Sequence, residues 1–404
     1  MNKKRIYIIG AGYAGIKALT QLAKIDDVEL FLLDKNSYHY LQTDVYDYLA
    51  GIVNLADVSV DLYTLCHSFE RNITFLQENV LRVDFEKNII ITEHTRYTYD
   101  YLILSSGAQT MLLDSIEGLK DNFHGIKSLD NALSFKQRFE QNIFNKLQSE
   151  GKCSRESKYS IVIAGAGLSG VEIAAQMADY AKEFYKDAGY LCSNVDITLI
   201  NSKKMPLPSN SSFMQKQAAK RLRQLGVKII TNSHVTKVEP KSVTLNHTDK
   251  IDMDFLIWTA GIMPSKLTNA LDVKKSKRGQ ILVDSFYRLI DYSNVFAIGD
   301  NAQLFNPSTN EMLPPTAQTA ELAASYVASN INNAITGKKL VKQSIKPKGF
   351  LASLGGRYGA AELFESIKLS GFIAYFLKKL VEKNYKYPLR KKCKEGYQNI
   401  INQK

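Results

Sequence analysis

Two glycine-rich segments constrain the fold of this 404-residue chain more than any other feature. The first reads "IYIIGAGYAGIKALTQLA" from Ile6, and the second reads "IVIAGAGLSGVEIAAQMA" from Ile161. Each is typical of an apolar strand, a tight glycine turn and a helix, which together form a dinucleotide-binding unit. Gly10 and Gly165 open the two turns and are 165 − 10 = 155 positions apart. We therefore expect an α/β fold with two Rossmann-like dinucleotide-binding domains.

The first segment carries the full set of residues that a dinucleotide needs. Gly10 makes the turn, Gly12 lets a pyrophosphate approach the backbone, and Gly15 lets the helix pack closely on the strand. The following apolar strand, "VELFLLD", ends at Asp34, which is 34 − 10 = 24 positions after Gly10. This is close to the separation of about 20 at which an acid binds the ribose hydroxyl.

The second segment repeats the glycines but lacks the acid. Its fingerprint glycines are Gly165, Gly167 and Gly170. The next strand, "VDITLIN", ends at Asn201 and is followed by Lys203 and Lys204. These lysines either attract the 2′-phosphate of NADPH or belong to an ordinary solvated turn. The sequence leaves the choice between NADH and NADPH open, and we expect NADH as the second nucleotide.

Further motifs give the chain a family resemblance. In order after the first fingerprint come "NSYHYLQTDVYDYLAG", "YDYLILSSG", the second fingerprint with "VE", "WTAGI", "VFAIGD", "PPTAQ" and "KGFLASLGG". This order resembles that of flavoprotein reductases with two dinucleotide-binding domains. Among these it is most similar to the type II NADH:quinone oxidoreductases, from about residue 4 to about residue 380.

The resemblance implies FAD on the first half and NADH, with NADPH possible, on the second, and no metal. The implied FAD-binding residues are Gly10, Gly12, Ala14, Gly15, Asp34, Lys35, Gln42, Val80, Gly107, Asp300, Ala317 and Gln318. The implied nicotinamide nucleotide residues are Gly165, Gly167, Gly170, Asn201 and Gly261. The expected domains are 1–115 with 265–340 for FAD, 116–264 for NAD(P)H, and 341–404 for membrane association.

Glu172 and Gln318 are the candidate catalytic residues. The resemblance places Gln318 at the flavin ring and Glu172 at the contact between nicotinamide and flavin, where it would help couple proton movement to reduction. Alternatively, Glu172 only stabilises the first turn of its helix by interacting with the helix dipole. The chain departs from the family at Asn201, where an acid is usual, at Leu322, where a second glutamine is usual, and at Thr43, where proline is common.

The four cysteines exclude some flavoenzyme classes. Cys66, Cys153, Cys192 and Cys393 lie far apart and form no C-x-x-C motif, so neither a zinc site nor a redox-active pair is expected. This argues against disulfide reductases of the same fold. A sulfide:quinone oxidoreductase, which would carry sulfur on cysteines, remains an alternative, although such an enzyme has no need of the second fingerprint.

The C-terminal segment carries most of the net charge of +12. Residues 368–404 contain ten basic and two acidic residues, which gives 10 − 2 = +8. One helical side gathers apolar residues, namely Phe372, Ile373, Phe376, Leu377, Leu380 and Val381. The opposite side gathers Lys378, Lys379, Glu382, Lys383 and Lys386, and Pro388 is expected to end the helix.

This pattern predicts an interfacial helix with its lysines at anionic headgroups and with Tyr375, Tyr385 and Tyr387 at headgroup level. The alternative is a helix packed on the protein's own core with a solvated lysine face. Nucleic acid is not expected as a partner, because no recognition motif accompanies the charge. The sequence shows neither a signal peptide nor a run of 18 apolar residues, so we expect a peripheral protein on the cytoplasmic face of the cell membrane. A homodimer is left open.

The functional expectation is transfer of a hydride from NADH to FAD, followed by transfer of two electrons to a membrane quinone without proton pumping. Two rivals remain beside the sulfide enzyme. One is a soluble NAD(P)H reductase of a redox protein, in which the basic tail docks an acidic partner. The other is a non-catalytic flavoprotein that senses NADH.

Overall fold

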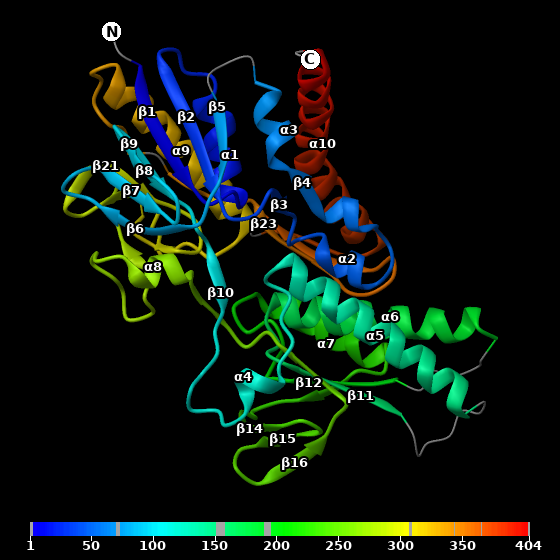
Figure 1. Cartoon of the computed structure of the whole chain (residues 1–404). Helices are drawn as coiled ribbons and strands as arrows, with labels where there is room; N and C mark the ends of the chain where they lie inside the picture. Colours follow the sequence, from blue (N-terminus) through cyan, green and yellow to red (C-terminus); the bar gives the residue numbers. More distant parts are fainter. Residues whose placement is uncertain are drawn as a thin grey trace.

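A computed structural model describes residues 3–69, 73–150, 158–189, 195–306, 309–342, 344–364 and 366–402. One half of the molecule is built on a six-stranded sheet in the order β20-β21-β9-β1-β2-β5 (Figure 1). Its strands are β20 (Arg288–Leu289), β21 (Tyr292–Ala297), β9 (Tyr101–Leu104), β1 (Lys4–Ile9), β2 (Val28–Asp34) and β5 (Ile73–Gln77). All neighbours are parallel except β20 with β21. Ile6 and Ile8 are fully buried in β1, as expected for a central parallel strand.

The other half is built on a four-stranded parallel sheet in the order β13-β12-β11-β17. Its strands are β13 (Lys228–Ile230), β12 (Val195–Ile200), β11 (Tyr159–Ala164) and β17 (Phe255–Trp258). Helix α6 (Leu168–Asp187) follows the second glycine turn and packs against β11, β12 and α7 (Ser212–Gln224). The corresponding helix of the first half, α1 (Tyr13–Leu22), packs along α9 (Ala317–Ile335).

The two halves repeat one topology. The order β5-β2-β1-β9 in the first sheet corresponds to β13-β12-β11-β17 in the second. Each half also inserts a three-stranded antiparallel meander before the last of these strands. The meanders are β6 (Val80–Asp84), β7 (Ile89–Thr92) and β8 (Arg96–Thr98), and β14 (Val235–Glu239), β15 (Ser242–Leu245) and β16 (Asp249–Asp252). The expected pair of Rossmann-like halves is confirmed.

Two short antiparallel strands, β10 (Ala108–Thr110) and β18 (Ile262–Pro264), pair where the chain passes between the halves. Near the C-terminus, the sheet of β23 (Gly349–Ser353), β24 (Gly359–Leu363) and β25 (Ile367–Gly371) contacts α6 and α7. The remaining elements are β3 (Tyr38–Tyr40), α2 (Val45–Leu49), η1 (Leu55–Val58), β4 (Ser59–Asp61), α3 (Leu62–His67), α4 (Leu119–Asn122), α5 (Leu129–Glu150), α8 (Lys266–Ala270), β19 (Ile281–Leu282) and β22 (Ala302–Gln303).

Helix α10 (Phe372–Asn402) runs back along α3, so the C-terminal end of the helix lies near the N-terminal half of the molecule (Figure 1). The expectation that Pro388 ends this helix was wrong, because the helix continues for more than three turns beyond it. A proline inside a helix removes one backbone hydrogen bond. Packing offsets that loss here, since Leu389 is buried and Gly396 lets α10 approach the backbone of α3 at Thr64.

The lysine side of α10 faces the protein. The expectation of lysines at anionic headgroups and the alternative of a solvated lysine face were therefore both wrong. Lys378 is buried, and Lys379 and Lys386 form ion pairs with carboxylates of other elements. Only Lys383 of the predicted cationic side is exposed. Tyr385 also points inward, where it bonds His39. The apolar side chains Phe372, Ile373, Phe376, Leu380 and Val381 are between 42% and 65% exposed.

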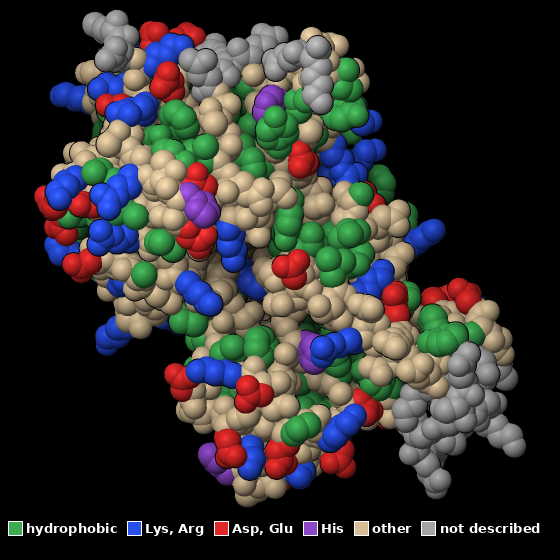
Figure 2. Space-filling view, in the orientation of Figure 1, with side chains coloured by type: hydrophobic (Ala, Val, Ile, Leu, Met, Phe, Trp, Pro, Cys, Tyr) green, Lys and Arg blue, Asp and Glu red, His purple; other side chains and the backbone are tan. Residues whose placement is uncertain are grey.

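No helix among the described residues is long and apolar enough to span a bilayer. On the face drawn in Figure 2, acidic and basic side chains are interspersed over both halves rather than collected in one basic patch. The same view shows the surface hollowed between the upper and lower halves.

Candidate functional site

The first glycine loop has the backbone geometry that a pyrophosphate cradle requires. Gly10 has φ +102°, and a Cβ there would collide with the Ser105 carbonyl. A Cβ at Gly15 would collide with the Gly10 carbonyl, whereas a Cβ at Gly12 would meet nothing within 4 Å. The space beside Gly12 is therefore open for a phosphate group at the N-terminus of α1. These observations fit FAD.

Asp34 supports this loop directly. Its Oδ2 accepts a hydrogen bond of 2.7 Å from the Ala11 N–H, and its Oδ1 accepts one of 2.8 Å from the Asn36 N–H. Burial raises the pKa of Asp34, and the two backbone hydrogen bonds oppose that rise. The acid predicted from spacing thus stands at the loop.

The second loop has nearly the same geometry. Gly165 has φ +107°, a Cβ at Gly170 would collide with the Gly165 carbonyl, and a Cβ at Gly167 would meet nothing within 4 Å. A hydroxyl stabilises each turn: Ser105 donates to the carbonyls of Ile9 and Gly10 in the first loop, and Thr259 occupies the same place in the second. The sequence did not mark these two hydroxyls. The second loop also fits a nucleotide.

One cavity of about 1480 Å³ joins the two halves and α10. It is lined by most predicted residues, namely Gly10, Gly12, Ala14, Asp34, Lys35, Gln42, Val80, Gly107, Glu172, Gly261, Asp300, Ala317 and Gln318. Gly15, Gly165, Gly167, Gly170 and Asn201 are not among its lining residues. Asn201 is 3% exposed, and its side-chain amide donates to the Met205 carbonyl at 2.6 Å.

Lys127 is a residue of the site that the sequence reasoning missed. Its Nζ donates to Gln42 Oε1 at 3.1 Å and to Asp300 Oδ2 at 3.3 Å. These three side chains come from three separate segments of the chain and all line the cavity. Lys127 therefore places a positive charge beside Asp300, a carboxylate that the resemblance assigns to FAD binding. No motif singled it out, because it lies in the segment between α4 and α5.

The start of helix α9 presents backbone donors to the cavity. Thr316 caps the helix by accepting from the Thr319 N–H at 3.2 Å. The N–H groups of Ala317 and Gln318, at the start of the first turn, have no acceptor within the helix. The Gln318 side chain accepts from the Lys348 N–H at 2.7 Å, so it also fixes the chain before β23. Such an end favours negative charge on a bound group.

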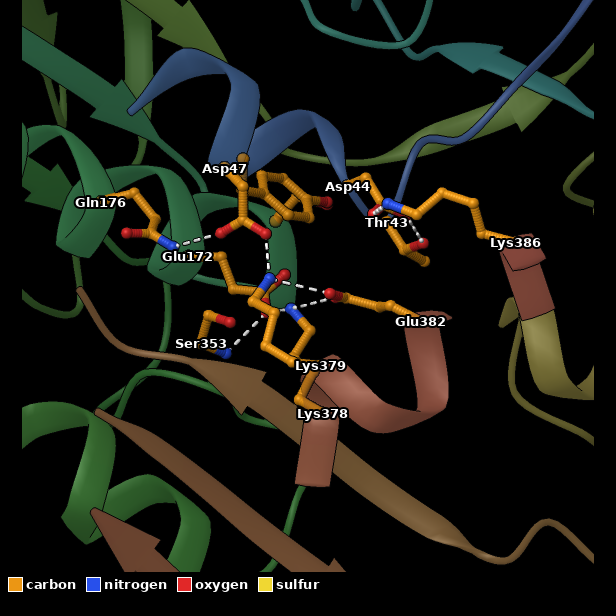
Figure 3. Close-up of polar contacts among 12 residues, drawn as sticks. Thr43, Asp44, Asp47, Glu172, Gln176, Ser353, Lys378, Lys379, Glu382 and Lys386 are labelled. Atoms are coloured by element: carbon orange, nitrogen blue, oxygen red, sulfur yellow. Dashed lines mark hydrogen bonds and ion pairs between the residues drawn. The ribbon is translucent and has the colours of Figure 1, made fainter. Parts of the chain in front are cut away.

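Glu172 lies at the centre of a buried ionic cluster (Figure 3). Its Oε1 accepts from the Ser353 N–H at 2.8 Å and forms an ion pair with Lys378. Lys378 also pairs with Glu382 at 3.5 Å. Glu172 is the fifth residue of α6 rather than part of its first turn, so the helix-dipole role was wrong. It pairs instead with the C-terminal helix.

Helix α2 adds a third side to the cluster. Asp47 forms an ion pair with Lys379 and accepts from Gln176 Nε2 at 2.8 Å, and Lys379 also pairs with Glu382 at 2.8 Å. Figure 3 shows these side chains converging from α2, α6 and α10. Beside them, Asp44 pairs with Lys386. Three carboxylates, of Asp47, Glu172 and Glu382, thus share two lysines.

Burial and ion pairing act in opposite directions on the pKa values of Glu172 and Lys378. Burial raises the pKa of Glu172, and the pairing with Lys378 reduces that rise. Burial alone would lower the pKa of Lys378, but Glu172 and Glu382 raise it overall. The cluster thus contains three carboxylates and two lysines, and burial is the main reason that the pKa of Glu172 is raised.

A second polar network lies beside the first glycine loop. The ring nitrogen Nδ1 of His39 lies 2.8 Å from the Ala11 carbonyl, and Nε2 lies 3.0 Å from the Tyr385 hydroxyl. A carbonyl only accepts, so Nδ1 carries the hydrogen and Nε2 accepts from Tyr385. Burial lowers the pKa of His39 to about 4. Tyr13 bonds the hydroxyl and the N–H of Thr43, a donor that the proline common in the family would lack.

The two cysteines that the structure describes, Cys66 and Cys393, lie outside the cavity. Cys66 is buried on α3, and Cys393 lies on α10, where its thiol contacts the Asp61 carbonyl. Burial raises the pKa of both thiols. Neither lines the cavity, whereas Cys153 and Cys192 lie outside the described residues. The described residues also include no group of His, Cys, Asp and Glu that could hold a metal ion.

Comparisons with known proteins agree with this architecture. The type II NADH:quinone oxidoreductase of Staphylococcus aureus is 27% identical over 388 residues, covering 94% of this chain and 94% of that protein. NDH2 from Plasmodium falciparum, solved in complex with NADH, has a TM-score of 0.83 at 20% identity, covering 99% of this chain and 98% of that one.

The fold is also shared with the sulfide:quinone oxidoreductase from Aquifex aeolicus, with a TM-score of 0.79 at 19% identity, covering 96% of this chain and 92% of that one. The family model described as pyridine nucleotide-disulphide oxidoreductase matches residues 4–324. Both glycine loops and the start of α9 fall within that range. The chain belongs to the pyridine nucleotide-disulphide oxidoreductase family.

Proposed function

We propose that the protein is a type II NADH:quinone oxidoreductase that works at the membrane surface. The observation that carries this proposal is the single cavity that extends from the first glycine loop, past Gln318 and Glu172, to α10. Val381 belongs both to the cavity lining and to the exposed apolar side of α10. An apolar substrate can therefore enter the cavity from the side of the molecule that suits a bilayer. The relative in Staphylococcus aureus has this activity by name.

When bound, FAD supplies the redox chemistry by accepting a hydride from NADH and passing two electrons to a quinone. The first loop and Asp34 hold its nucleotide end, and the second loop holds the reductant. The N-terminal end of α9 stabilises negative charge in the cavity without having to reorganise. Glu172, buried and sharing lysines with two other carboxylates, accepts from the Ser353 N–H and from Lys378, so its carboxylate is placed to take up a proton during turnover.

The quinone end of the cavity lies between α9 and α10. Leu322 lines it where relatives commonly carry a glutamine, and Glu321 lines it one position earlier. Burial raises the pKa of Glu321. Tyr385 lies on the opposite side with its hydroxyl bonded to His39. We propose that this more apolar wall receives the ring and that the carboxyl of Glu321 lies within its reach.

We assign residues 1–115 and 265–340 to FAD, 116–264 to the nicotinamide nucleotide, and 341–404 to membrane association. The exposed apolar side of α10 supports attachment to the membrane, with its aromatic residues at the acyl boundary. The expected location is the cytoplasmic face of the cell membrane, where NADH is produced.

The test follows the flavin absorbance of the purified protein. Adding NADH without oxygen should bleach the flavin, and adding a soluble quinone should restore the absorbance at least as fast as steady-state turnover. Bleaching without reoxidation by quinone would refute the proposal and favour a reductase of a redox protein. No bleaching would favour an NADH sensor. Bleaching by sulfide in place of NADH would favour the sulfide enzyme; among the described residues, no cysteine lines the cavity.

A further inference from the structure

The internal repeat makes the two nucleotide sites directly comparable. The Gly10 N–H donates to the Leu33 carbonyl at 2.8 Å, and the Gly165 N–H donates to the Ile200 carbonyl at 3.0 Å. Asp34 follows Leu33, and Asn201 follows Ile200. Each residue therefore directly follows the strand residue whose carbonyl bonds the glycine turn. Asp34 and Asn201 occupy equivalent places in the two halves.

Their side chains behave differently. Asp34 reaches back to the glycine loop, where Oδ2 accepts from the Ala11 N–H. Asp34 also accepts from the N–H two residues later, at Asn36. Asn201 keeps only the equivalent of this second contact, in which its Oδ1 accepts from the Lys203 N–H at 3.3 Å. Its Nδ2 turns away from the loop and donates to the Met205 carbonyl. The second site therefore has no carboxylate where the first has one, and the amide that replaces it is committed to its own turn.

The charge around Asn201 is uniformly positive along the chain. Between Asp196 and Glu239 the sequence contains no acidic residue and eight basic residues. Ser202, Lys203 and Lys204 directly follow Asn201 and are exposed. A hydroxyl and two exposed ammonium groups thus stand at the corner where the adenosine ribose of a nucleotide on the second loop would lie.

A carboxylate at this corner binds the ribose 2′-hydroxyl and repels a 2′-phosphate. A phosphate monoester adds about −1.5 to −2 charges at neutral pH, so the sign of nearby charge decides whether it is tolerated. Lysine holds phosphate as a point charge and needs no fixed geometry. We propose that the second nucleotide site accepts NADPH as well as NADH, with the 2′-phosphate held at Ser202, Lys203 and Lys204. This inference rests on the proposed function, because it assumes that the reductant binds the second loop.

The test compares kcat/KM for NADPH and NADH with one soluble quinone. We expect the two values to lie within about tenfold of each other. If NADH works normally but kcat/KM for NADPH is below about one hundredth of the value for NADH, the inference is overturned and the proposed function stands. If neither nucleotide reduces the flavin, the proposed function fails together with it.

The variant Lys203→Glu with Lys204→Glu separates charge from folding, because both side chains are exposed. It should lower kcat/KM for NADPH at least tenfold, mainly through KM, and leave NADH within about twofold. The same change at exposed Lys277, in the other half, is the matched control and should alter neither nucleotide. If the double variant lowered kcat/KM equally for NADPH and NADH, the inference would be overturned.

Binding of adenosine 2′,5′-bisphosphate gives a readout without turnover. It should bind the purified protein more tightly than AMP does, and the double charge reversal should abolish that difference. Asn201→Asp should shift preference towards NADH by restoring the carboxylate. Equal affinity of the unaltered protein for both fragments would overturn the inference.

Discussion

Replacing Lys378 with methionine tests the electrostatic description of the buried cluster. Methionine keeps most of the apolar stem, so the change removes chiefly the charge. Glu382 keeps Lys379 as a partner at 2.8 Å, whereas Glu172 loses its only ion pair among the described residues and stays 2% exposed. A buried carboxylate without a cation avoids the free-energy cost of an unpaired buried charge by taking up a proton.

The free energy needed to protonate Glu172 sets the size of the destabilisation. From an ordinary pKa of 4.5, protonation at pH 7 costs (7 − 4.5) × about 1.36, or about 3.4 kcal/mol. At pH 5 the same step costs about 0.7 kcal/mol. Lys378→Met should therefore destabilise the protein by about 3 kcal/mol at pH 7, within the range for a broken buried pair, and by far less at pH 5.

The assay is urea unfolding followed by far-ultraviolet circular dichroism at both pH values. In an E172Q background, Lys378→Met should cost less than about 1 kcal/mol, because no carboxylate is left unpaired. Lys383→Met changes an exposed lysine of the same helix and should cost about 0 to 0.5 kcal/mol. A loss for Lys378→Met that is equal at pH 5 and pH 7, or unchanged in the E172Q background, would refute the reasoning.

Three further outcomes are expected. The His39 pKa of about 4 lies below its ordinary 6.5, so neutral His39 contributes stability above pH 6.5 that is lost as the pH falls towards 4. The total is on the order of 3 kcal/mol, and His39→Gln should flatten this part of the stability curve measured by urea unfolding. Lys127→Met leaves Asp300 without its lysine and should weaken FAD retention on dialysis by about tenfold; unchanged retention would contradict its place at the flavin. Phe376→Ser should reduce flotation with anionic vesicles, whereas Met312→Ser, equally exposed and remote from α10, should not.

The repeated strand–glycine–helix units could be predicted from the sequence because their signals are local. The turn at Gly10 and the acid at Asp34 lie within one βαβ unit, and their spacing follows from the unit itself. The structure confirms both fingerprints and the buried strands that precede them.

The orientation of α10 could not be predicted in the same way. An amphipathic pattern separates two sides of a helix but does not say which side faces the protein. That choice depends on Asp44, Asp47 and Glu172, which lie between 206 and 342 positions away from their lysine partners. Buried carboxylates made the lysine side the inner one. Lys127 escaped notice for the same reason, since its partners Gln42 and Asp300 meet it only in the folded chain.

The inward lysines of α10 also decide how the protein should respond to ionic strength. Lys378, Lys379 and Lys386 are neutralised by internal carboxylates, so they add little to attraction towards anionic headgroups. Salt at physiological strength screens exposed charges over about 8 Å, whereas burial of apolar side chains is not screened. Membrane fractions washed with concentrated salt should therefore keep the protein, and a mild detergent should release it. The tail's excess of basic residues thus overstates the electrostatic part of the proposed attachment to the membrane.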